Sequence, residues 1–496
     1  MPTPRAIVRT GLTRVWLQEG GAGPTVAPAY MGVWKAGAVS WDFGESTAIE
    51  IPADDQYDQF QEVASIPGTK GKPTIPMTAR YARDLSEMLR MARRGCENDL
   101  QIHIGECEDP QLFTSGWRKI VALDKFRISN YSTDDLGALS SDERAAVNET
   151  INTQGSDMYE IVRLTLAEIC AANVIQEVLD VTYCDSKSCG GECGTASDGC
   201  NKLYALIKAA GGSPGLGSQV VYSDDAGSTC GATPITSLAA NEEPDEFACL
   251  GLYIVVVSED STSHHYALKE DILLGTETWQ ESAAYAAGPR CIFALKPGYA
   301  WIGGVGGYIW ALDNPNNAPT VLDAGSATVQ NLNDIHAFDE THIVAVGAAN
   351  AVVYSTDGTT FAVVTGPAPA VALNCVWMRS ETEWWIGTAG GQLWYTRDSG
   401  TTWTQKTFSG SGAGQVRAIN FVTNQVGYLA HDTATPAGRI LRTIDGGYQW
   451  YVLPEATGSI PANDRINALA NCGDPNVILG GGLADNATDG VLIKGS

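Results

Sequence analysis

The sequence predicts a mainly β protein: an N-terminal β-barrel or sandwich-like domain with a flanking helix over residues 1–160, then a seven-bladed β-propeller over residues 174–496. Three observations predict this organisation. The chain has 496 residues, more than one hydrophobic core usually covers. A short motif recurs in the C-terminal two thirds with a period of 41 to 47 residues. The first third instead combines short alternating strands with one amphipathic helix.

Composition and charge exclude several classes of protein. Hydrophobic residues make up 44% of the chain, which excludes a disordered protein. The formal net charge of −26 has the wrong sign for a general nucleic-acid binder. No apolar run is long enough to predict a membrane span. Residues 1–160 contain 16 Lys and Arg against 23 Asp and Glu, a net charge of −7, so the other −19 falls on the later part.

The recurring motif is Ser/Thr-x-Asp-x-Gly-x-Thr-Trp, and four segments match it wholly or in part. Its residues are Ser223, Asp225 and Gly227 in the first copy, Ser355 and Asp357 in the second, Thr396, Asp398, Gly400 and Trp403 in the third, and Thr443, Asp445, Gly447 and Trp450 in the fourth.

The residues that precede these segments extend the period through the whole region. They are Tyr222, Tyr354, Tyr395 and Arg442, and steps of about 44 residues from the first fall on Tyr266 and Trp310. A period of this length with β-type patterns is typical of a propeller with four strands in each blade. The seventh position falls on Val491–Lys494, after which no outer strand follows, so we expect Val174–Tyr183 to supply that strand.

The motif resembles the Asp-box, or BNR repeat, of sialidases, sortilin-like receptors and photosystem II assembly-factor propellers. The resemblance implies a turn between the two outer strands of a blade, in which Asp accepts backbone N–H groups, Gly has a positive φ and Trp packs under the turn. The four Asp residues are therefore expected to be structural. A sialidase would also need three converging arginines, and residues 161–496 contain few, so we expect no enzyme activity, no catalytic or metal site and no cofactor.

A cysteine-rich insertion is expected at residues 184–200. Its four cysteines, Cys184, Cys189, Cys193 and Cys200, could bind zinc as thiolates or form two disulfides, and the even number of cysteines favours disulfides. Cys230, which replaces a motif Trp, could pair with Cys249 or pack as a small apolar residue.

The sequence predicts that the first domain consists of strands around one main helix. A helix is expected at 82–94, and a capping box at 140–143 predicts another short helix that runs towards Thr150. An extended loop is expected at 67–76. Strands are expected at 39–43, 48–51, 100–104, 117–123 and 159–169.

This order of elements, and the segment 99–149 in particular, resembles the tail tube proteins of long-tailed bacteriophages. The resemblance implies a structural virion protein of the tail, assembled in the host cytoplasm, that self-assembles into stacked hexameric rings. Its partners would be further copies of itself and other tail proteins, with DNA passing through without specific binding and no membrane insertion, while the propeller decorates the outside. The alternative is a propeller protein that binds a partner protein as an assembly factor, or a glycan-binding, sialidase-like protein.

Overall fold

The computed structural model describes the strands within residues 13–154 and most of residues 157–495. The gaps in the later range are 175, 185–199, 209–216, 283–284, 297, 434–437, 456–464 and 484–489. The chain divides into two compact units, Met1–Arg163 with Asp445–Tyr448, and Leu164–Ile444 with Gln449–Ser496. Each unit is described by itself.

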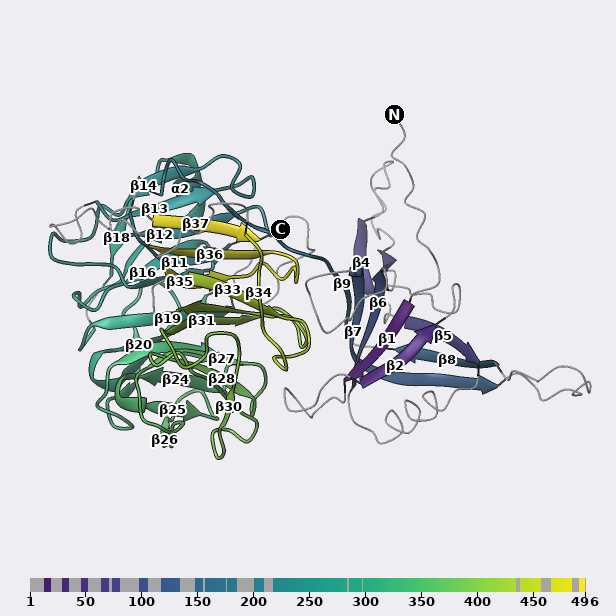
Figure 1. Cartoon of the computed structure of the whole chain (residues 1–496). Helices are drawn as coiled ribbons and strands as arrows, with labels where there is room; N and C mark the ends of the chain where they lie inside the picture. Colours follow the sequence, from purple (N-terminus) through teal and green to yellow (C-terminus); the bar gives the residue numbers. More distant parts are fainter. Residues whose placement is uncertain are drawn as a thin grey trace, which may run out of the picture. The chain divides into compact units, whose positions relative to one another are not determined.

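The second unit contains seven four-stranded antiparallel sheets in its described residues, here called ring sheets 1 to 7 (Figure 1). Ring sheet 1 is β11 (Val178–Tyr183), β12 (Leu203–Ile207), β13 (Gln219–Ser223) and β14 (Gly231–Pro234). Ring sheet 2 is β15 (Glu246–Leu250), β16 (Tyr253–Val257), β17 (His265–Leu268) and β18 (Gln280–Glu281). Ring sheet 3 is β19 (Pro289–Lys296), β20 (Tyr299–Gly304), β21 (Tyr308–Leu312) and β22 (Thr320–Ala324).

The remaining ring sheets repeat this order of strands. Ring sheet 4 is β23 (Leu332–Ala337), β24 (Ile343–Gly347), β25 (Val352–Ser355) and β26 (Ala362–Val364). Ring sheet 5 is β27 (Leu373–Met378), β28 (Trp384–Thr388), β29 (Leu393–Thr396) and β30 (Thr404–Lys406). Ring sheet 6 is β31 (Val416–Phe421), β32 (Gly427–Asp432), β33 (Gly438–Thr443) and β34 (Tyr451–Val452). Ring sheet 7 is β35 (Arg465–Ala470), β36 (Ile478–Leu483), β37 (Gly490–Gly495) and β10 (Leu166–Glu168). Short helices α2 (Lys269–Leu274), η2 (Val305–Gly307) and η3 (Ala348–Asn350) connect some strands.

The ring sheets contact one another through their first strands. Each of β11, β15, β19, β23, β27 and β31 contacts the first strand of the next ring sheet, and β11 also contacts β35 and β36. Ring sheet 7 therefore returns to ring sheet 1, and the first strands are the inner strands of a ring. Their middle residues are largely apolar because both faces of the sheet pack against neighbouring sheets.

The predicted ladder of residues is confirmed as a structural repeat. Its members lie in the third strand of successive ring sheets, Tyr222 in β13, Tyr266 in β17, Trp310 in β21, Tyr354 in β25, Tyr395 in β29 and Arg442 in β33. The seventh position falls in β37, the third strand of ring sheet 7.

The strand that completes ring sheet 7 differs from the prediction. The strand β10 pairs with β37, with Leu166 opposite Gly495 and Glu168 opposite Ile493. The expected donor, Val174–Tyr183, instead contributes β11, the inner strand of ring sheet 1. Its apolar run suits a position between two sheets, whereas a three-residue outer strand leaves no periodic signal in the sequence. The ring thus begins at residue 166 rather than 174.

Large aromatic side chains fill the spaces between neighbouring ring sheets. Trp301, Trp310, Trp384 and Trp385 are fully buried. Trp385 of ring sheet 5 lies 5.3 Å from Phe421 and 6.1 Å from Trp450, both of ring sheet 6, measured between ring centroids. Each such contact removes apolar surface from water and so holds adjacent sheets together.

The first unit is built on one sheet with the order β2-β1-β6-β7-β8-β5, and β9 also pairs with β7. The strands are β1 (Thr13–Gln18), β2 (Ala29–Trp34), β5 (Thr74–Arg80), β6 (Asn98–Gly105), β7 (Trp117–Thr133), β8 (Asn148–Gln154) and β9 (Asp157–Ile161), with a separate hairpin of β3 (Ser46–Ile51) and β4 (Ala64–Lys70). Ile120, Val121, Ala122 and Leu123 of β7 are all fully buried, so both faces of this strand are covered. In the described strands β2 and β5 end the sheet without pairing with each other, and the expected barrel closure is not seen.

Several expectations for the first unit need correction. The predicted loop at 67–76 falls largely within β4 and β5, because Ile66, Ile75 and Met77 supply strand residues among the prolines. The short helix expected to reach Thr150 gives way to β8 at Asn148. The predicted strand at 39–43 and the predicted helix at 82–94 lie outside the described residues. The described residues contain no helix that is both long and apolar enough to cross a membrane.

Candidate functional site

The inner strands of the ring sheets surround a channel with a volume of about 490 Å³. All seven inner strands contribute residues to its wall. Because these strands run side by side, residues at equivalent positions form layers along the channel. Two such layers are defined below as the bulge layer and the carboxyl layer.

The bulge layer lies where six of the inner strands shift register against their second strands, and in ring sheet 2 it is represented by Asp245, which directly precedes β15. Its residues are Leu179, Asp245, Arg290, Asn333, Asn374, Arg417 and Asn467. Four of its side chains donate a hydrogen bond to a main-chain carbonyl of the next ring sheet: Arg290 to Leu332 (3.2 Å), Asn333 to Leu373 (2.8 Å), Asn374 to Val416 (3.0 Å) and Asn467 to Val178 (2.9 Å). The last of these bonds joins ring sheet 7 to ring sheet 1.

The carboxyl layer lies one residue further along each inner strand. Its side chains also make hydrogen bonds to the next ring sheet, but they accept these bonds instead of donating them. It consists of Asp180, Glu246, Cys291, Asp334, Cys375, Ala418 and Ala468. Its three carboxyl groups accept main-chain N–H groups of the next ring sheet: Asp180 from Phe247 (3.2 Å), Glu246 from Ile292 (2.8 Å) and Asp334 from Val376 (2.7 Å). These carboxyl groups therefore connect neighbouring sheets.

Burial dominates the protonation of this layer. It raises the pKa of Asp180 and of Asp334 to about 7, against the opposing effect of their backbone hydrogen bonds. Burial also raises the pKa of Glu246 well above its ordinary value, and the nearby Asp180 and Asp334 raise it further. The thiols of Cys291 and Cys375 are free and buried, with raised pKa values, so they are poor nucleophiles.

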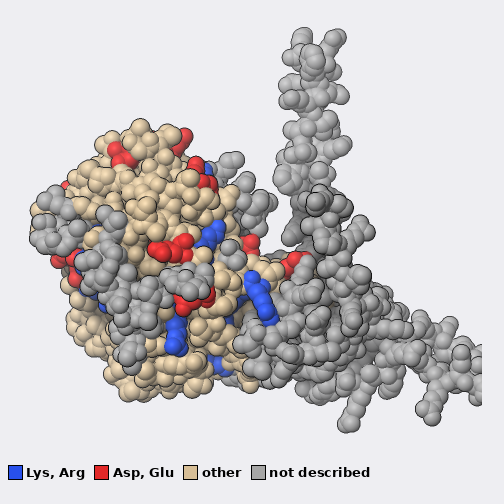
Figure 2. Space-filling model, turned by 45° about the horizontal axis from the view of Figure 1, so that its top comes forward, with Lys and Arg blue, Asp and Glu red and all other residues tan. Residues whose placement is uncertain are grey.

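The basic residues at the channel are engaged by carboxylates. Arg290 forms an ion pair with Glu259, and Arg417 forms one with Asp432. Figure 2 shows, on the face of the molecule that it draws, separate basic side chains with acidic ones near them. The described channel therefore offers no free arginine cluster of the kind a sialidase uses.

The motif residues lie in four separate turns, each between the third and fourth strands of its ring sheet. These turns belong to ring sheets 1, 4, 5 and 6, so the structure does not bring the four Asp residues together. In ring sheet 1, Asp225 accepts the N–H of Thr229 at 2.8 Å, and Ser223 Oγ accepts the N–H of Gly227 at 2.9 Å. The N–H and hydroxyl groups of Thr229 and the hydroxyl of Ser223 donate to Asp225 and lower its pKa to about 2.

The other turns repeat this arrangement. Asp398 accepts the N–H of Thr402 at 2.8 Å, and Thr396 Oγ1 accepts that of Gly400 at 2.9 Å. Ser355 and Asp357 make the matching contacts with Gly358 and Thr360. Thr443, Asp445, Gly447 and Trp450 occupy the same place between β33 and β34. Gly400 has φ +80° and Gly447 has φ +89°, a region of backbone conformation that favours glycine.

The last residue of the motif contacts the preceding ring sheet. Trp403 donates from Nε1 to the carbonyl oxygen of Thr365, which follows ring sheet 4, and Trp450 packs on Trp385 of ring sheet 5. Cys230 has this position in ring sheet 1, and its disulfide to Cys170 reaches the segment that follows β10 of ring sheet 7. A covalent bond thus takes the place of tryptophan packing where the ring closes.

The cysteine predictions are wrong in their pairing. Cys184 pairs with Cys249 and Cys200 with Cys472, with Cα–Cα distances of 6.2 and 5.1 Å, so neither pairs within the insertion. Cys230 does not pair with Cys249, because neighbouring inner strands bring Cys249 close to Cys184 instead. A zinc site of all four insertion cysteines is incompatible with these bonds. Cys189 and Cys193 lie outside the described residues.

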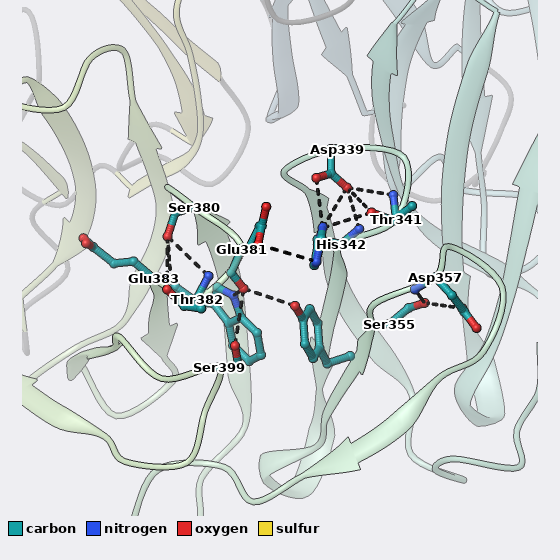
Figure 3. A network of polar contacts seen from close by, with 12 residues as sticks. Asp339, Thr341, His342, Ser355, Asp357, Ser380, Glu381, Thr382, Glu383 and Ser399 are labelled. Atoms are coloured by element: carbon teal, nitrogen blue, oxygen red, sulfur yellow. Dashed lines mark hydrogen bonds and ion pairs between the residues drawn. The ribbon is translucent and has the colours of Figure 1, made fainter. Parts of the chain in front are cut away.

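A polar cluster at the rim joins ring sheets 4 and 5 (Figure 3). Asp339 Oδ2 lies 2.9 Å from His342 Nδ1, and Glu381 Oε2 lies 3.9 Å from His342 Nε2. These three residues are the group in the described chain that could hold a metal ion. Asp339, however, also accepts the N–H groups of Thr341 and His342; burial raises its pKa, but these bonds and that of the Thr341 hydroxyl outweigh it and lower the pKa to about 2. The carboxylate oxygens of Asp339 are thus engaged in hydrogen bonds within its own loop.

The carboxyl and bulge layers were not singled out from the sequence. A signal exists: a polar pair stands before an apolar run in Asp245-Glu246-Phe247 and again in Asn333-Asp334-Ile335, two periods later. Recognising it requires the register of strands that are about 40 residues apart, which the motif turns alone do not supply.

No protein-family model matches this sequence, and no curated protein matches it. Solved structures do. YCF48 from Cyanidioschyzon merolae is 13% identical and covers 66% of this chain and 98% of its own, with a TM-score of 0.50. The structure of YCF48 bound to D1 peptide (13%, 67% and 95%, TM-score 0.49) and that of the RRP9 WD40 repeats (9%, 66% and 99%, TM-score 0.48) are also similar. At these identities the similarity concerns the fold, which is mainly β, with antiparallel four-stranded sheets arranged like a propeller.

Proposed function

We propose that this chain is a seven-bladed β-propeller protein that binds a partner protein within a larger assembly and does not catalyse a reaction. The observation that carries this proposal is the use of the channel carboxyl groups. Asp180, Glu246 and Asp334 each accept a main-chain N–H group of the next ring sheet. A carboxyl group that accepts a main-chain N–H group of a neighbouring sheet has a structural use, since it connects the two sheets.

The other polar groups of the channel also support a structural role. The bulge layer donates to main-chain carbonyls, Arg290 and Arg417 are paired with carboxylates, and the thiols of Cys291 and Cys375 are buried. A closed ring of this kind is a rigid scaffold with a large outer surface, which suits recognition of another protein.

Absence of catalysis is tested with a set of chromogenic glycosides, esters and phosphates on the full-length chain. We expect no turnover above that of the Glu246→Gln variant. Hydrolysis of any of these substrates that Glu246→Gln or Asp334→Asn abolishes, while the folded state remains, would contradict the proposal.

Partner binding is tested by cross-linking mass spectrometry on full-length protein isolated gently from its source. Lys202, Lys208 and Lys406 lie in the second unit and provide reactive amines. Cross-links from these lysines to one other protein, retained through size-exclusion chromatography, are expected. A 52.5 kDa monomer with no intermolecular cross-links would argue against an assembly role.

A second candidate is the tail tube subunit of a long-tailed phage. One observation favours it: the sheet of the first unit ends in β2 on one side and β5 on the other, without pairing between them in the described strands. Two different open edges are a surface through which identical subunits can join head to tail into a ring. Negative-stain images of the full-length protein at high concentration test it, since stacked rings support this candidate and dispersed monomers oppose it.

A further inference from the structure

A histidine at the rim of the ring lies between two carboxylates that come from different ring sheets (Figure 3). His342 directly precedes β24 in ring sheet 4, in the same loop as Asp339, and Glu381 lies in the equivalent hairpin of ring sheet 5, between β27 and β28. Each of the three residues offers one ligand atom, and these atoms lie within 4.8 Å of one another. The three residues are here called the rim cluster. His342 and Glu381 are about one period of the repeat apart, so only the packing of the two sheets brings them together.

The hydrogen bond to Asp339 determines which nitrogen of His342 can bind an ion. A carboxylate only accepts hydrogen bonds. His342 Nδ1 lies 2.9 Å from Oδ2 and 3.0 Å from Oδ1 of Asp339, so Nδ1 is the donor and carries a proton. In the neutral ring the lone pair is then on Nε2. Histidines that bind metal ions typically have this arrangement, in which the other ring nitrogen donates to a carboxylate.

The nitrogen that carries the lone pair faces the second carboxylate. His342 Nε2 lies 3.9 Å from Glu381 Oε2. A lone pair and a carboxylate oxygen repel each other unless a positive charge lies between them, and a metal ion supplies such a charge. The two side chains are 19% and 59% exposed, so an ion can reach both from solvent.

The loop that carries Glu381 is held in place by hydrogen bonds to its main chain. The carbonyl oxygen of Glu381 accepts three of them: from the hydroxyl of Tyr354 at 3.1 Å, from Nε1 of Trp384 at 3.1 Å and from the hydroxyl of Ser399 at 3.4 Å. Tyr354 belongs to ring sheet 4, so this contact also fixes the Glu381 loop against the sheet that carries His342. The carboxylate is thus presented to the imidazole by a fixed backbone.

The two ligand atoms determine which ion fits. An imidazole nitrogen with a carboxylate oxygen suits a divalent transition metal such as Zn²⁺, whereas Ca²⁺ and Mg²⁺ prefer about six or more oxygen ligands. Tetrahedral zinc with bonds of about 2.1 Å separates two of its ligand atoms by about 3.4 Å. A small rotation of the exposed Glu381 side chain closes the distance of 3.9 Å to this value. Water supplies the remaining ligands.

We propose that the rim cluster binds a Zn²⁺ ion between Nε2 of His342 and the carboxylate of Glu381, with Asp339 orienting the imidazole ring. The ion links the first hairpins of ring sheets 4 and 5. This site goes beyond the binding of a partner protein and does not depend on it, because both metal ligands come from this chain.

The test uses the full-length protein without an affinity tag, in a buffer that does not coordinate metals. Isothermal titration calorimetry with zinc chloride measures the affinity, and titration with calcium chloride tests the choice of ion. We expect saturable zinc binding with a Kd of ~100 μM or tighter, and no binding of Ca²⁺ at the same concentrations.

Two variants locate the site. His342→Gln replaces the imidazole with an amide, which is a poor zinc ligand, and Glu381→Gln keeps the size of the side chain and removes its charge. Each is expected to weaken zinc binding at least tenfold. Glu270→Gln, which removes an exposed carboxylate from α2 in ring sheet 2, is the matched control and should bind zinc as the unmodified protein does.

The proposal is overturned if the unmodified protein shows no saturable binding at zinc concentrations up to ~1 mM, or if either variant binds zinc as tightly as the unmodified protein does. Thermal unfolding in the presence of a chelator checks that the variants are folded. Should His342→Gln fail to fold, Glu381→Gln decides the outcome by the same criterion, because its side chain is exposed and contributes little to packing.

Discussion

Asn467 donates from Nδ2 to the carbonyl oxygen of Val178 at 2.9 Å and so connects the last ring sheet to the first. The equivalent bonds elsewhere, such as that of Asn333 to Leu373, connect sheets that are consecutive in the chain. Two of the three disulfides of the described ring, Cys170–Cys230 and Cys200–Cys472, cross the closure between ring sheets 7 and 1, and the third, Cys184–Cys249, joins ring sheets 1 and 2. The three-residue strand β10 is thus one of several links that close the ring.

The first prediction concerns the side-chain bond of this closure. Asn467→Ala removes the donor to Val178 and leaves a part-buried carbonyl without it, which should lower the free energy of unfolding by about 1–2 kcal/mol. Denaturant unfolding measures it. With the disulfides reduced, the loss should exceed that of Asn333→Ala, because of these two residues only Asn467 bridges the junction between the last and the first ring sheet, which the chain connects only through the three-residue strand β10. Equal losses in reduced protein would show that the closure is no weaker than other junctions.

The second prediction concerns the disulfide between Cys200 and Cys472. It joins residues 272 positions apart, so its removal frees much more of the unfolded chain than removal of Cys184–Cys249, with a separation of 65. The double variant Cys200→Ser, Cys472→Ser should lose about 3–5 kcal/mol of unfolding free energy, and Cys184→Ser, Cys249→Ser should lose less. Thermal and denaturant unfolding under non-reducing conditions compare the two, and the reverse order would contradict the ring closure described here.

The third prediction concerns the motif turns. Thr396 is buried, and its Oγ1 accepts the N–H of Gly400 and donates to Asp398. Thr396→Val keeps the shape and removes both bonds, which should cost about 1–2 kcal/mol in unfolding free energy. The exposed Thr278→Val is the control and should change stability little. If both substitutions have the same effect, the hydroxyl of Thr396 does not stabilise the turn.

Repeated local features were predictable from the sequence, and long-range pairings were not. The Asp-turns and the ladder through Tyr222, Trp310 and Arg442 depend on short segments, so they predicted the third strand of each ring sheet correctly. The closing strand β10 has three residues, too few for a periodic pattern. The pairing of Cys200 with Cys472 depends on which sheets become neighbours in the ring, which no local spacing encodes.

The same distinction between local and long-range features explains why the channel residues could not be predicted from the sequence. Asp180, Glu246 and Asp334 are separated by 66 and 88 residues, and a bulge in each of several strands sets their common level. In the sequence these acids stand within or directly before short apolar runs and are far apart. The register of neighbouring sheets reveals that each one caps an N–H group of the next.

The central claim, that these half-buried carboxyl groups of the channel connect neighbouring ring sheets, is tested most directly by the free energy of unfolding as a function of pH. The folded pKa of Asp180 and Asp334 is about 7, while that of the unfolded chain is near 4, so the folded form retains protons that the unfolded form has lost. Their contribution is full below pH 4 and disappears as the pH rises through 7. The lowered pKa values of His264 and His336 act in the opposite sense, but only below about pH 6.5.

The informative window is therefore pH 6.5 to 8.5. Across it we expect the free energy of unfolding to fall by about 1–3 kcal/mol. Glu246→Gln, which keeps an acceptor for the N–H of Ile292 and removes a carboxyl group whose pKa folding raises well above its ordinary value, should flatten this fall, whereas the exposed Glu270→Gln should not. Stability that stays constant or rises between pH 6.5 and 8.5, or a fall that Glu246→Gln leaves unchanged, would contradict a structural role for the channel carboxyl groups.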